Sequence, residues 1–183
     1  KELLNFCTVD LSAFYFDIRK DTLYCDNLNS KKRKNCVVIL NILLDCLLKW
    51  FAPILSFTTE EIYSLISKNK NDSIHLKKFI KTPENWQNKK LNEKWDELIK
   101  IRDAANISIE KKRAEKLIGS SLESNIKIKL KKDLYNIAKD IDFAELCITS
   151  AAEVTLENNL NDEIDVETMK AEGNKCNVCW KIS

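Results

Sequence analysis

Four stretches of the chain place apolar residues at the three- and four-residue spacing of one helix face. The pattern predicts a first helix over residues 3–24 and a second from just after Ser30 to just before Pro53. A third helix is predicted from Thr59, and a long fourth helix over residues 89–116. Because the links between these segments are short, we expect the helices to pack as a bundle through their apolar stripes.

Local signals predict where these helices begin and end. Ser30 is of the type that caps helix N-termini, and Thr58 and Glu61 stand in the Thr-x-x-Glu relation of a capping box. Pro53 pushes the residue before it out of the α region, so the second helix is expected to end there.

After the fourth predicted helix the period of the pattern changes. "SNIKIKL", residues 124–130, alternates apolar and polar positions, as a half-buried strand does. Residues 131–145 are predicted to form a short helix, and residues 146–156 a strand pair with a break. Residues 68–86 predict a loop, and the acidic segment 158–174 is polar enough to predict a flexible connector.

These segments predict a mainly α fold with four parts. They are a helical bundle over residues 1–118, a small α/β subdomain over 119–157, an acidic linker over 158–174 and a truncated zinc-binding knuckle over 175–183.

Composition supports a folded, helix-rich chain. With 183 residues, 44% of them hydrophobic, the chain can bury a core, and its two glycines and two prolines leave few residues for hairpin turns. The net charge of +2 does not by itself indicate a polyanionic partner. Charge is unevenly distributed, however: residues 111–139 hold nine basic and three acidic residues, and residues 140–172 hold ten acidic and one basic. Such blocks predict a binding face next to a solvated connector, or two solvent-facing surfaces.

The seven cysteines do not read as a disulfide framework. Five are scattered along apolar patterns, where free cysteine acts as a small hydrophobe, so a reducing, intracellular compartment is expected. No apolar run approaches the roughly 20 residues that cross a bilayer, so no membrane partner is expected. Because the chain starts with lysine and its single methionine is Met169, we expect it to be a piece of a longer protein.

"KCNVCWKIS", residues 175–183, carries the clearest chemical signal. Cys176 and Cys179 are spaced so that their thiolates can occupy two adjacent corners of a tetrahedral zinc site. Two ligands stabilise a knuckle far less than four, so the last ten residues are expected to be loose. The alternatives are a coincidental pair and, less favoured without a βαβ pattern, a redox dithiol. Trp180 would either present an aromatic plate to an unpaired RNA base or pack under the knuckle as a small core.

Basic residues supply candidate phosphate contacts. The densest cluster, at the entry to the second predicted helix, consists of Lys31, Lys32, Arg33 and Lys34. A charge run at a helix start is usually just solvated, but cations there oppose the helix dipole, so a polyanionic partner and a merely solvated run stay open as equal alternatives. Arg102 and Arg113 are further candidates on the fourth helix. His75 is interpreted as a loop residue, and the chain contains no glycine-rich phosphate loop.

Four blocks, in this order, resemble the C-terminal part of bacterial-type isoleucyl-tRNA synthetases, and together they cover nearly the whole chain. They are "DLSAFYFDIRKDTLYCD", "KRKNCVVILNILLDCLLKWFAPILSFTTEEIY", "WDELIKIRDAANISIEKKRAEKLIGSSLESNIKI" and "KCNVCW". The resemblance implies a class I synthetase that joins isoleucine to its tRNA with ATP and Mg, and that edits misactivated valine. It also implies that the helical bundle and a zinc-bearing appendage hold the anticodon stem and loop of tRNA(Ile), with Zn bound in part by Cys176 and Cys179.

Some features depart from the family pattern. The chain has neither the His-Ile-Gly-His nor the Lys-Met-Ser-Lys-Ser signature, so catalysis is expected to lie in other sequence. Val37 and Val38 stand where the family often has Gln-Thr, Lys181 follows the tryptophan where histidine is common, and no second Cys-x-x-Cys pair is present. Two alternatives stay open, a helical protein–protein interaction scaffold and the same region of a valyl- or leucyl-tRNA synthetase. We expect a cytoplasmic, monomeric protein that binds no DNA.

Overall fold

A computed structural model describes residues 1–69 and 71–183, and Lys70, in the predicted loop of residues 68–86, lies outside the described residues. The chain forms two compact units. One, here called the sheet unit, consists of Lys1–Asp21 together with Asn88–Ser183, and the other, the helical unit, is Thr22–Gln87. The helical unit is therefore inserted into the sequence of the sheet unit.

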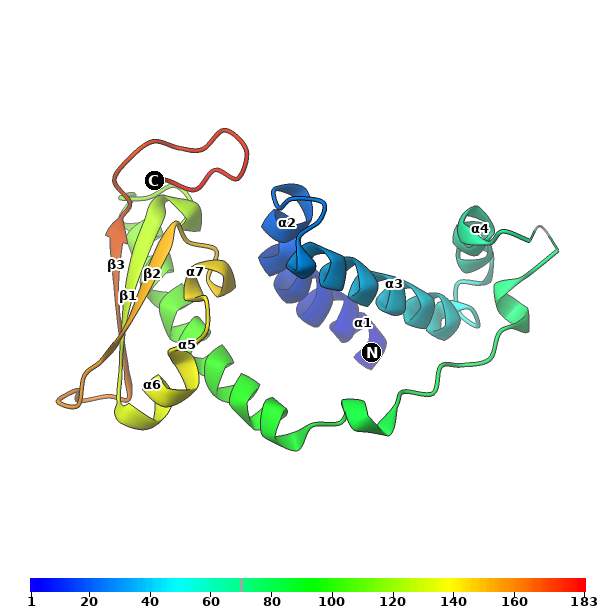
Figure 1. Ribbon diagram of the computed structural model, residues 1–183, viewed down its shortest axis with the longest axis horizontal. Coiled ribbons are helices and arrows are strands. Elements are labelled where there is room, and N and C mark those ends of the chain that lie inside the picture. The colour runs from blue at the N-terminus through cyan, green and yellow to red at the C-terminus, as the bar shows by residue number, and fades with distance from the viewer. Residues whose placement is uncertain (70) are drawn as a thin grey trace. The chain divides into compact units, whose positions relative to one another are not determined.

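The predicted helices are present, with changes at their ends. The first helical run consists of α1 (Glu2–Asn5), η1 (Phe6–Phe16) and α2 (Asp17–Tyr24), followed by α3 (Lys31–Phe51), α4 (Ser56–Ile66), the single turns η2 (Ile74–Leu76) and η3 (Glu84–Trp86), and α5 (Lys89–Ala114) (Figure 1). The first run is helical throughout, as predicted, but η1 is wound as a π-helix. In the part of the chain that the structure describes, no helix is long and apolar enough to cross a membrane.

The predicted limits of α3 are confirmed. The Ser30 hydroxyl accepts a hydrogen bond from the Arg33 amide at 3.4 Å, and the helix ends at Phe51 with Ala52 as its C-cap, directly before Pro53. The capping serine and the proline therefore set both ends of this helix.

The predicted capping box at the start of α4 is wrong. The helix begins at Ser56, which places Thr58 inside the first turn, where its side chain cannot serve as the N-cap. The cause is the turn before it: the amides of Ile54 and Leu55 both donate to the Phe51 carbonyl, at 2.8 and 2.7 Å. This tight turn brings the chain into helical geometry three residues earlier than the pattern predicts.

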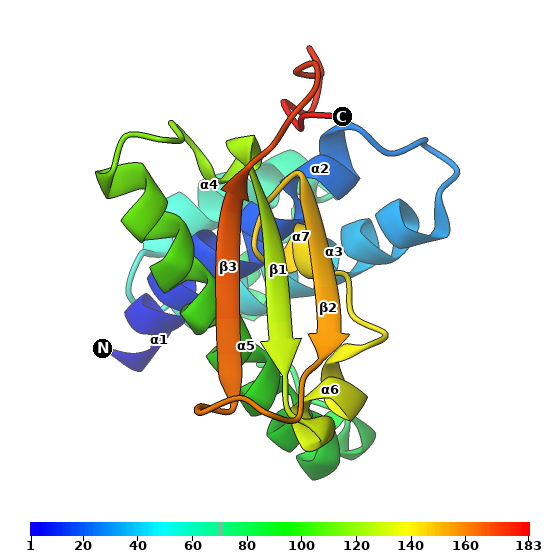
Figure 2. The ribbon, with the colours of Figure 1, turned by 90° about the vertical axis from the view of Figure 1, so that its left-hand side faces the viewer.

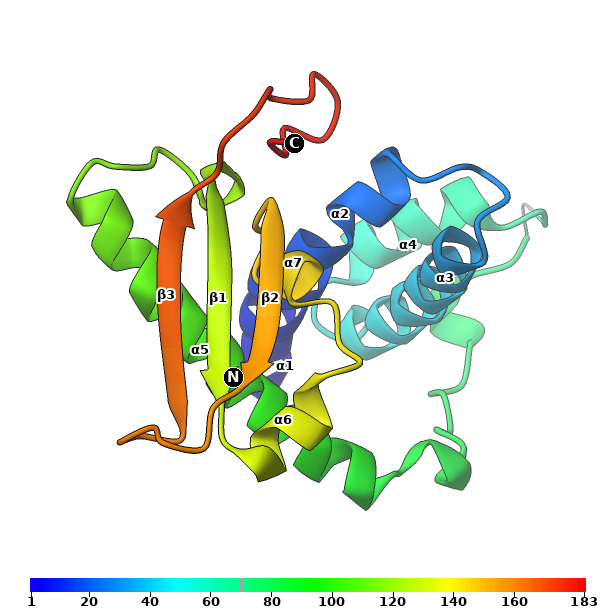
Figure 3. The ribbon, with the colours of Figure 1, turned by 60° about the vertical axis from the view of Figure 1, so that its left-hand side comes forward.

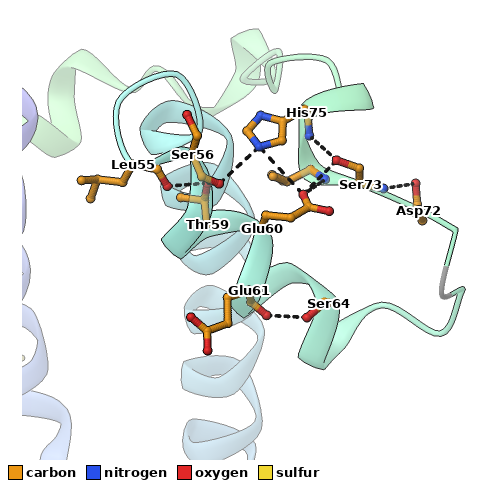
Figure 4. Close-up of polar contacts among 10 residues, drawn as sticks. Leu55, Ser56, Thr59, Glu60, Glu61, Ser64, Asp72, Ser73 and His75 are labelled. Carbon is orange, nitrogen blue, oxygen red and sulfur yellow. Dashed lines mark hydrogen bonds and ion pairs between the residues drawn. The ribbon is translucent and has the colours of Figure 1, made fainter.

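The helical unit has a small core and a polar seam. Leu48, Ala52 and Ile74 are buried together, so the loop that contains η2 packs on the end of α3. Polar contacts hold the same loop on α4 (Figure 4): one Glu60 carboxylate oxygen accepts from the Ser73 hydroxyl at 2.8 Å and from the Ile74 amide at 3.0 Å. His75, predicted to be a loop residue, lies in the single turn η2.

The sheet unit contains three strands in the order β2-β1-β3 (Figure 2). The central strand β1 (Ser124–Leu130) is the strand predicted from alternation; it pairs parallel with β2 (Ala151–Leu156) and antiparallel with β3 (Ile164–Lys170). A parallel neighbour requires a crossover connection, which α6 (Lys132–Ala138) and α7 (Phe143–Leu146) provide.

Two predictions for this region are wrong in part. Residues 146–156 contain one strand, β2, and not a strand pair, because Leu146 ends α7 and the chain turns at Ile148, which has a φ of 57°. The expected flexible connector over residues 158–174 contains the edge strand β3. Two of its acidic residues face one basic partner on the central strand: Lys129 Nζ lies 3.0 Å from Asp165 and 4.0 Å from Glu167. This lysine offsets part of the negative charge, and backbone pairing with β1 holds the strand in the sheet.

Helix α5 lies along one face of the sheet (Figures 2 and 3). The buried positions of β1 alternate with half-exposed ones, and they share one core with α5. The residues of this core that are fully shielded from solvent include Leu98, Ile101, Ala105, Ile128 and Leu130. Hydrogen bonds fix the helix against the edge strand: Ser108 donates to the Val166 carbonyl at 3.0 Å, and its hydroxyl lies 2.7 Å from the Thr168 hydroxyl.

Candidate nucleic-acid interface

Residues 173–183 form a closed turn at one end of the sheet (Figure 3), although the sequence predicts a loose segment. Asn174 and Ser183 exchange two backbone hydrogen bonds, at 3.0 and 3.2 Å. Inside this pair, the Cys176 amide donates to the Lys181 carbonyl at 2.8 Å. We call this segment the terminal turn. Gly173 begins it with a φ of 133°, and a Cβ there would lie 2.7 Å from the Ser183 backbone, so the closure requires glycine.

Two side chains attach the terminal turn to the sheet unit. The Ser150 hydroxyl donates to the Leu122 carbonyl at 2.5 Å and accepts from the Ile182 amide at 2.6 Å. Glu123 accepts a hydrogen bond from the Gly119 amide at 2.8 Å and lies 3.7 Å from Lys175 Nζ. The Gly119 hydrogen bond, followed by the nearby lysines, holds the pKa of Glu123 below its ordinary value. Sequence reasoning missed these anchors, because nothing in the local pattern connects residues so far apart.

The two predicted metal ligands lie in the terminal turn. The Val178 amide points at Cys176 Sγ, with a nitrogen-to-sulfur distance of 3.5 Å. Hydrogen bonds from the amides of Cys179 and Val178, and from the Cys179 side chain, lower the pKa of the Cys176 thiol, which favours the thiolate that binds metals. In residues 1–69 and 71–183, no cluster of three or more His, Cys, Asp or Glu side chains could hold a metal ion. The pair offers two sulfur donors, whereas a structural zinc ion takes four ligands.

Trp180 is presented to solvent. Its side chain is 60% exposed and its backbone is left-handed, with a φ of 63°. The Trp180 amide donates to the Cys176 carbonyl at 3.0 Å, and Lys175 Nζ lies 5.8 Å from the ring centroid. This exposure favours the aromatic plate over the alternative of a small buried core.

The basic cluster of residues 31–34 forms the first turn of α3 in the helical unit. Lys31, Lys32 and Lys34 are exposed, whereas Arg33 is half-buried. Arg33 donates from its guanidinium to the Asp26 carbonyl at 2.7 Å, and Lys34 Nζ donates to the Asn29 side chain at 3.3 Å. The cluster therefore also orders the loop before the helix.

Arg102 is held inside the sheet unit. Its Nε donates to the Leu146 carbonyl at 3.0 Å, and its guanidinium lies 5.1 Å from the Phe14 ring centroid. Phe14 in turn meets Trp95 edge-on, with ring centroids 6.4 Å apart. These contacts let Arg102 link its own helix, α5, to α7 and η1.

Arg113 lines an open groove at the end of α5, together with Lys116 and Lys170. Its guanidinium pairs with Glu110 at 2.7 Å, one turn earlier on the helix. Lys116 follows the helix in the left-handed conformation, with a φ of 58°. The Lys116 amide donates to the Arg113 carbonyl and the next amide to the Lys112 carbonyl, which is the Schellman pattern, where glycine is usual. A side chain in this conformation costs about 1–2 kcal/mol.

Comparisons with known proteins agree with the resemblance seen in the sequence. The family described as "Anticodon-binding domain of tRNA ligase" matches residues 1–130. The isoleucine–tRNA ligase of Pelagibacter ubique (strain HTCC1062) is 63% identical over 183 residues, and that of Agrobacterium fabrum (strain C58) is 42% identical over 192 residues. Each alignment covers 100% of this chain and 20% of the relative. The isoleucine–tRNA ligase of Mesorhizobium japonicum is 44% identical over 151 residues, which is 82% of this chain and 15% of the relative. The chain therefore spans about a fifth of the length of these relatives.

Proposed function

Because the chain belongs to the family of anticodon-binding domains of tRNA ligases, we propose that it is the part of an isoleucine–tRNA ligase that holds the anticodon stem and loop of tRNA(Ile). The family match over residues 1–130 carries this proposal. The choice of isoleucine over valine or leucine is supported by the names of the relatives described above. The complete ligase would attach isoleucine to its tRNA with ATP and Mg, in a catalytic region outside this chain.

The chain acts by positioning its RNA. Binding of the anticodon end orients the distant acceptor end, so binding energy gained here is used at a remote reaction centre. Trp180 offers an exposed ring on which an unpaired base stacks, and such stacking contributes about 1–3 kcal/mol per base. Lys31, Lys32 and Lys34 supply phosphate contacts from the helical unit. Arg33 and Arg102 contribute mainly by ordering the surfaces around them, since both already bind backbone carbonyls.

Zinc binding is part of the same proposal. Cys176 and Cys179 supply two thiolates, and the remaining ligands come from other residues of the ligase. When bound, the ion would stiffen the turn that carries Trp180, since structural zinc stabilises small knuckles strongly. The protein acts as a cytoplasmic monomer.

The experiment compares two exposed tryptophans. Trp180 and Trp86 are 60% and 57% exposed, but Trp86 lies in η3 of the helical unit. We expect Trp180→Ala to weaken binding of a tRNA(Ile) transcript about 5- to 150-fold in a filter-binding assay, the equivalent of one stacked base, and Trp86→Ala to leave it unchanged. The proposal fails if the unmodified chain holds the transcript no better than an acidic control protein of similar size does.

A further inference from the structure

The open groove beside Arg113 collects basic side chains from two elements of the sheet unit. Arg113 and Lys116 come from the end of α5, and Lys170 is the last residue of β3. Figure 2 shows that the end of α5, the tip of β3 and the terminal turn lie at the same end of the sheet. Ile118 and Gly119 complete the lining between them.

Stabilisation of helix α5 explains the presence of only one of the three basic residues of the groove. Cations near a helix C-terminus interact favourably with its dipole, which accounts for Arg113. It does not account for Lys170, which lies on a strand, or for a lysine at position 116, where the left-handed backbone favours glycine. A strained residue with a charged side chain in a groove indicates a function for that side chain.

The charges of the groove are unevenly paired. The two acidic residues that line it have partners: Glu110 binds Arg113, and Glu123 binds the Gly119 amide. Among the described residues, Lys116 and Lys170 lie in no ion pair within 4 Å, and both are exposed. The hydrogen bond from the neutral Gly119 amide leaves the charge of Glu123 in place, and Lys170 is close enough to lower the pKa of that carboxyl. The groove thus presents two exposed lysines, with three basic and two acidic residues in its lining.

One residue, Glu123, connects the groove to the terminal turn. Glu123 lines the groove and lies 3.7 Å from Lys175 Nζ, and Lys175 lies over the Trp180 ring. A strand of RNA with one base on Trp180 would therefore have its backbone directed along Lys175 toward Lys116 and Lys170.

We propose that Arg113, Lys116 and Lys170 form a binding site for the sugar-phosphate backbone of the RNA strand that contacts Trp180. This inference rests on the proposed function and adds a backbone site in the sheet unit, two of whose residues no sequence motif identified. The site recognises phosphate charge and not base identity, since lysine and arginine contacts to phosphates carry no sequence information.

The test uses the full 183-residue chain and a fluorescently labelled tRNA(Ile) transcript, titrated from about 50 to 200 mM KCl. Each lost phosphate contact reduces the slope of log affinity against log salt by about 0.7–0.9, so the fall in affinity over this range shrinks about threefold per contact. We expect this change for Lys116→Gly and for Lys170→Gln. The matched control is Lys139→Gln, which removes the same charge from an exposed residue that caps α6, at the opposite end of the sheet (Figure 2).

A second readout separates binding from folding. Lys116→Gly relieves the left-handed strain, so its midpoint of thermal unfolding should stay the same or rise while RNA affinity falls. A merely structural lysine would not produce opposite changes.

The proposal is overturned if Lys116→Gly and Lys170→Gln keep the parental salt slope, or if Lys139→Gln changes it equally. It is also overturned if polyglutamate of matched charge displaces the transcript as well as single-stranded RNA does. A parent chain that binds no transcript would refute the proposed function as well. If Trp180→Ala lowers the RNA affinity and the two lysine variants do not, only this inference is refuted.

Discussion

Ser150→Ala tests whether the terminal turn is attached to the sheet unit through one hydroxyl. The Ser150 hydroxyl makes two short hydrogen bonds, to the Leu122 carbonyl and from the Ile182 amide. Leu122 is buried, at 6% exposed, so its carbonyl would lose its partner where water has little access. The Ile182 amide, at the half-exposed end of the turn, would regain a partner from water.

The two losses are therefore unequal. Leaving a buried acceptor unsatisfied costs about 1–3 kcal/mol, whereas a hydrogen bond exchanged for one to water costs about 0.5–1.5 kcal/mol. We expect Ser150→Ala to lower the free energy of unfolding of the sheet unit by about 1.5–4.5 kcal/mol, the sum of the two losses, measured by urea denaturation followed by circular dichroism. Native-state hydrogen exchange should show a larger local effect at the Ile182 amide.

The matched control is Ser120→Ala. Ser120 lies near the same end of β1, and its side chain makes no capping hydrogen bond to η4. Its replacement should change the free energy of unfolding by less than about 0.5 kcal/mol. The reasoning is refuted if both variants have the same stability and if exchange of the Ile182 amide is as slow in Ser150→Ala as in the parent.

Three other changes have defined outcomes. Gly173→Ala would place a Cβ 2.7 Å from the Ser183 backbone at a φ of 133°, so the terminal turn should open, with a rise in the mobility of Trp180 seen by fluorescence anisotropy; unchanged anisotropy would contradict this. Ile128→Ala removes a fully buried side chain from the central strand and should lower the free energy of unfolding by about 2–5 kcal/mol in urea, and a loss below 1 kcal/mol would show that the core is not packed as described. Hydrogen bonds from Lys77 and Tyr63 lower the pKa of Asp72, so its contribution to stability is present above the unfolded pKa of about 3.9 and is lost as pH falls through the folded pKa. Asp72→Asn should therefore lower the melting temperature at neutral pH and make less difference in acid; an equal deficit at both would rule out this linkage.

Much of the fold could be predicted from sequence because its signals are local. A serine cap and a following proline set α3, and strict alternation identified β1. Strand β3 was missed although it has the same period: Ile164, Val166 and Thr168 alternate with polar residues. Its acidic composition predicts a solvated segment instead. The prediction failed because the partner lysine, Lys129 of β1, lies 36 residues before Asp165, and no local window contains both.

The candidate site likewise contains residues that the sequence predicts and residues that only the structure reveals. Spacing alone identified the cysteine pair and the tryptophan after it, and the structure places them in one turn. The side chains that attach this turn, Ser150 and Glu123, come from other parts of the chain and have no motif. Lys116 lies in the basic block of residues 111–139, but no sequence pattern distinguishes it from the other lysines there. Its left-handed backbone is visible only in the structure.

The insertion of the helical unit into the sequence of the sheet unit has a consequence for synthesis on the ribosome. Thr22–Gln87 is continuous and can fold as soon as it emerges, whereas Lys1–Asp21 belongs to a unit whose other segment begins at Asn88. Ile18 of α2 belongs to the buried core of that unit, so its packing can be completed only after the second segment has been translated. Once folded, the insert shortens the effective loop between the two segments and lowers the entropy lost in joining them. A nascent chain stalled before residue 164 should consequently hold a folded insert and a central strand whose edge toward β3 is unpaired, and such an edge is prone to aggregation.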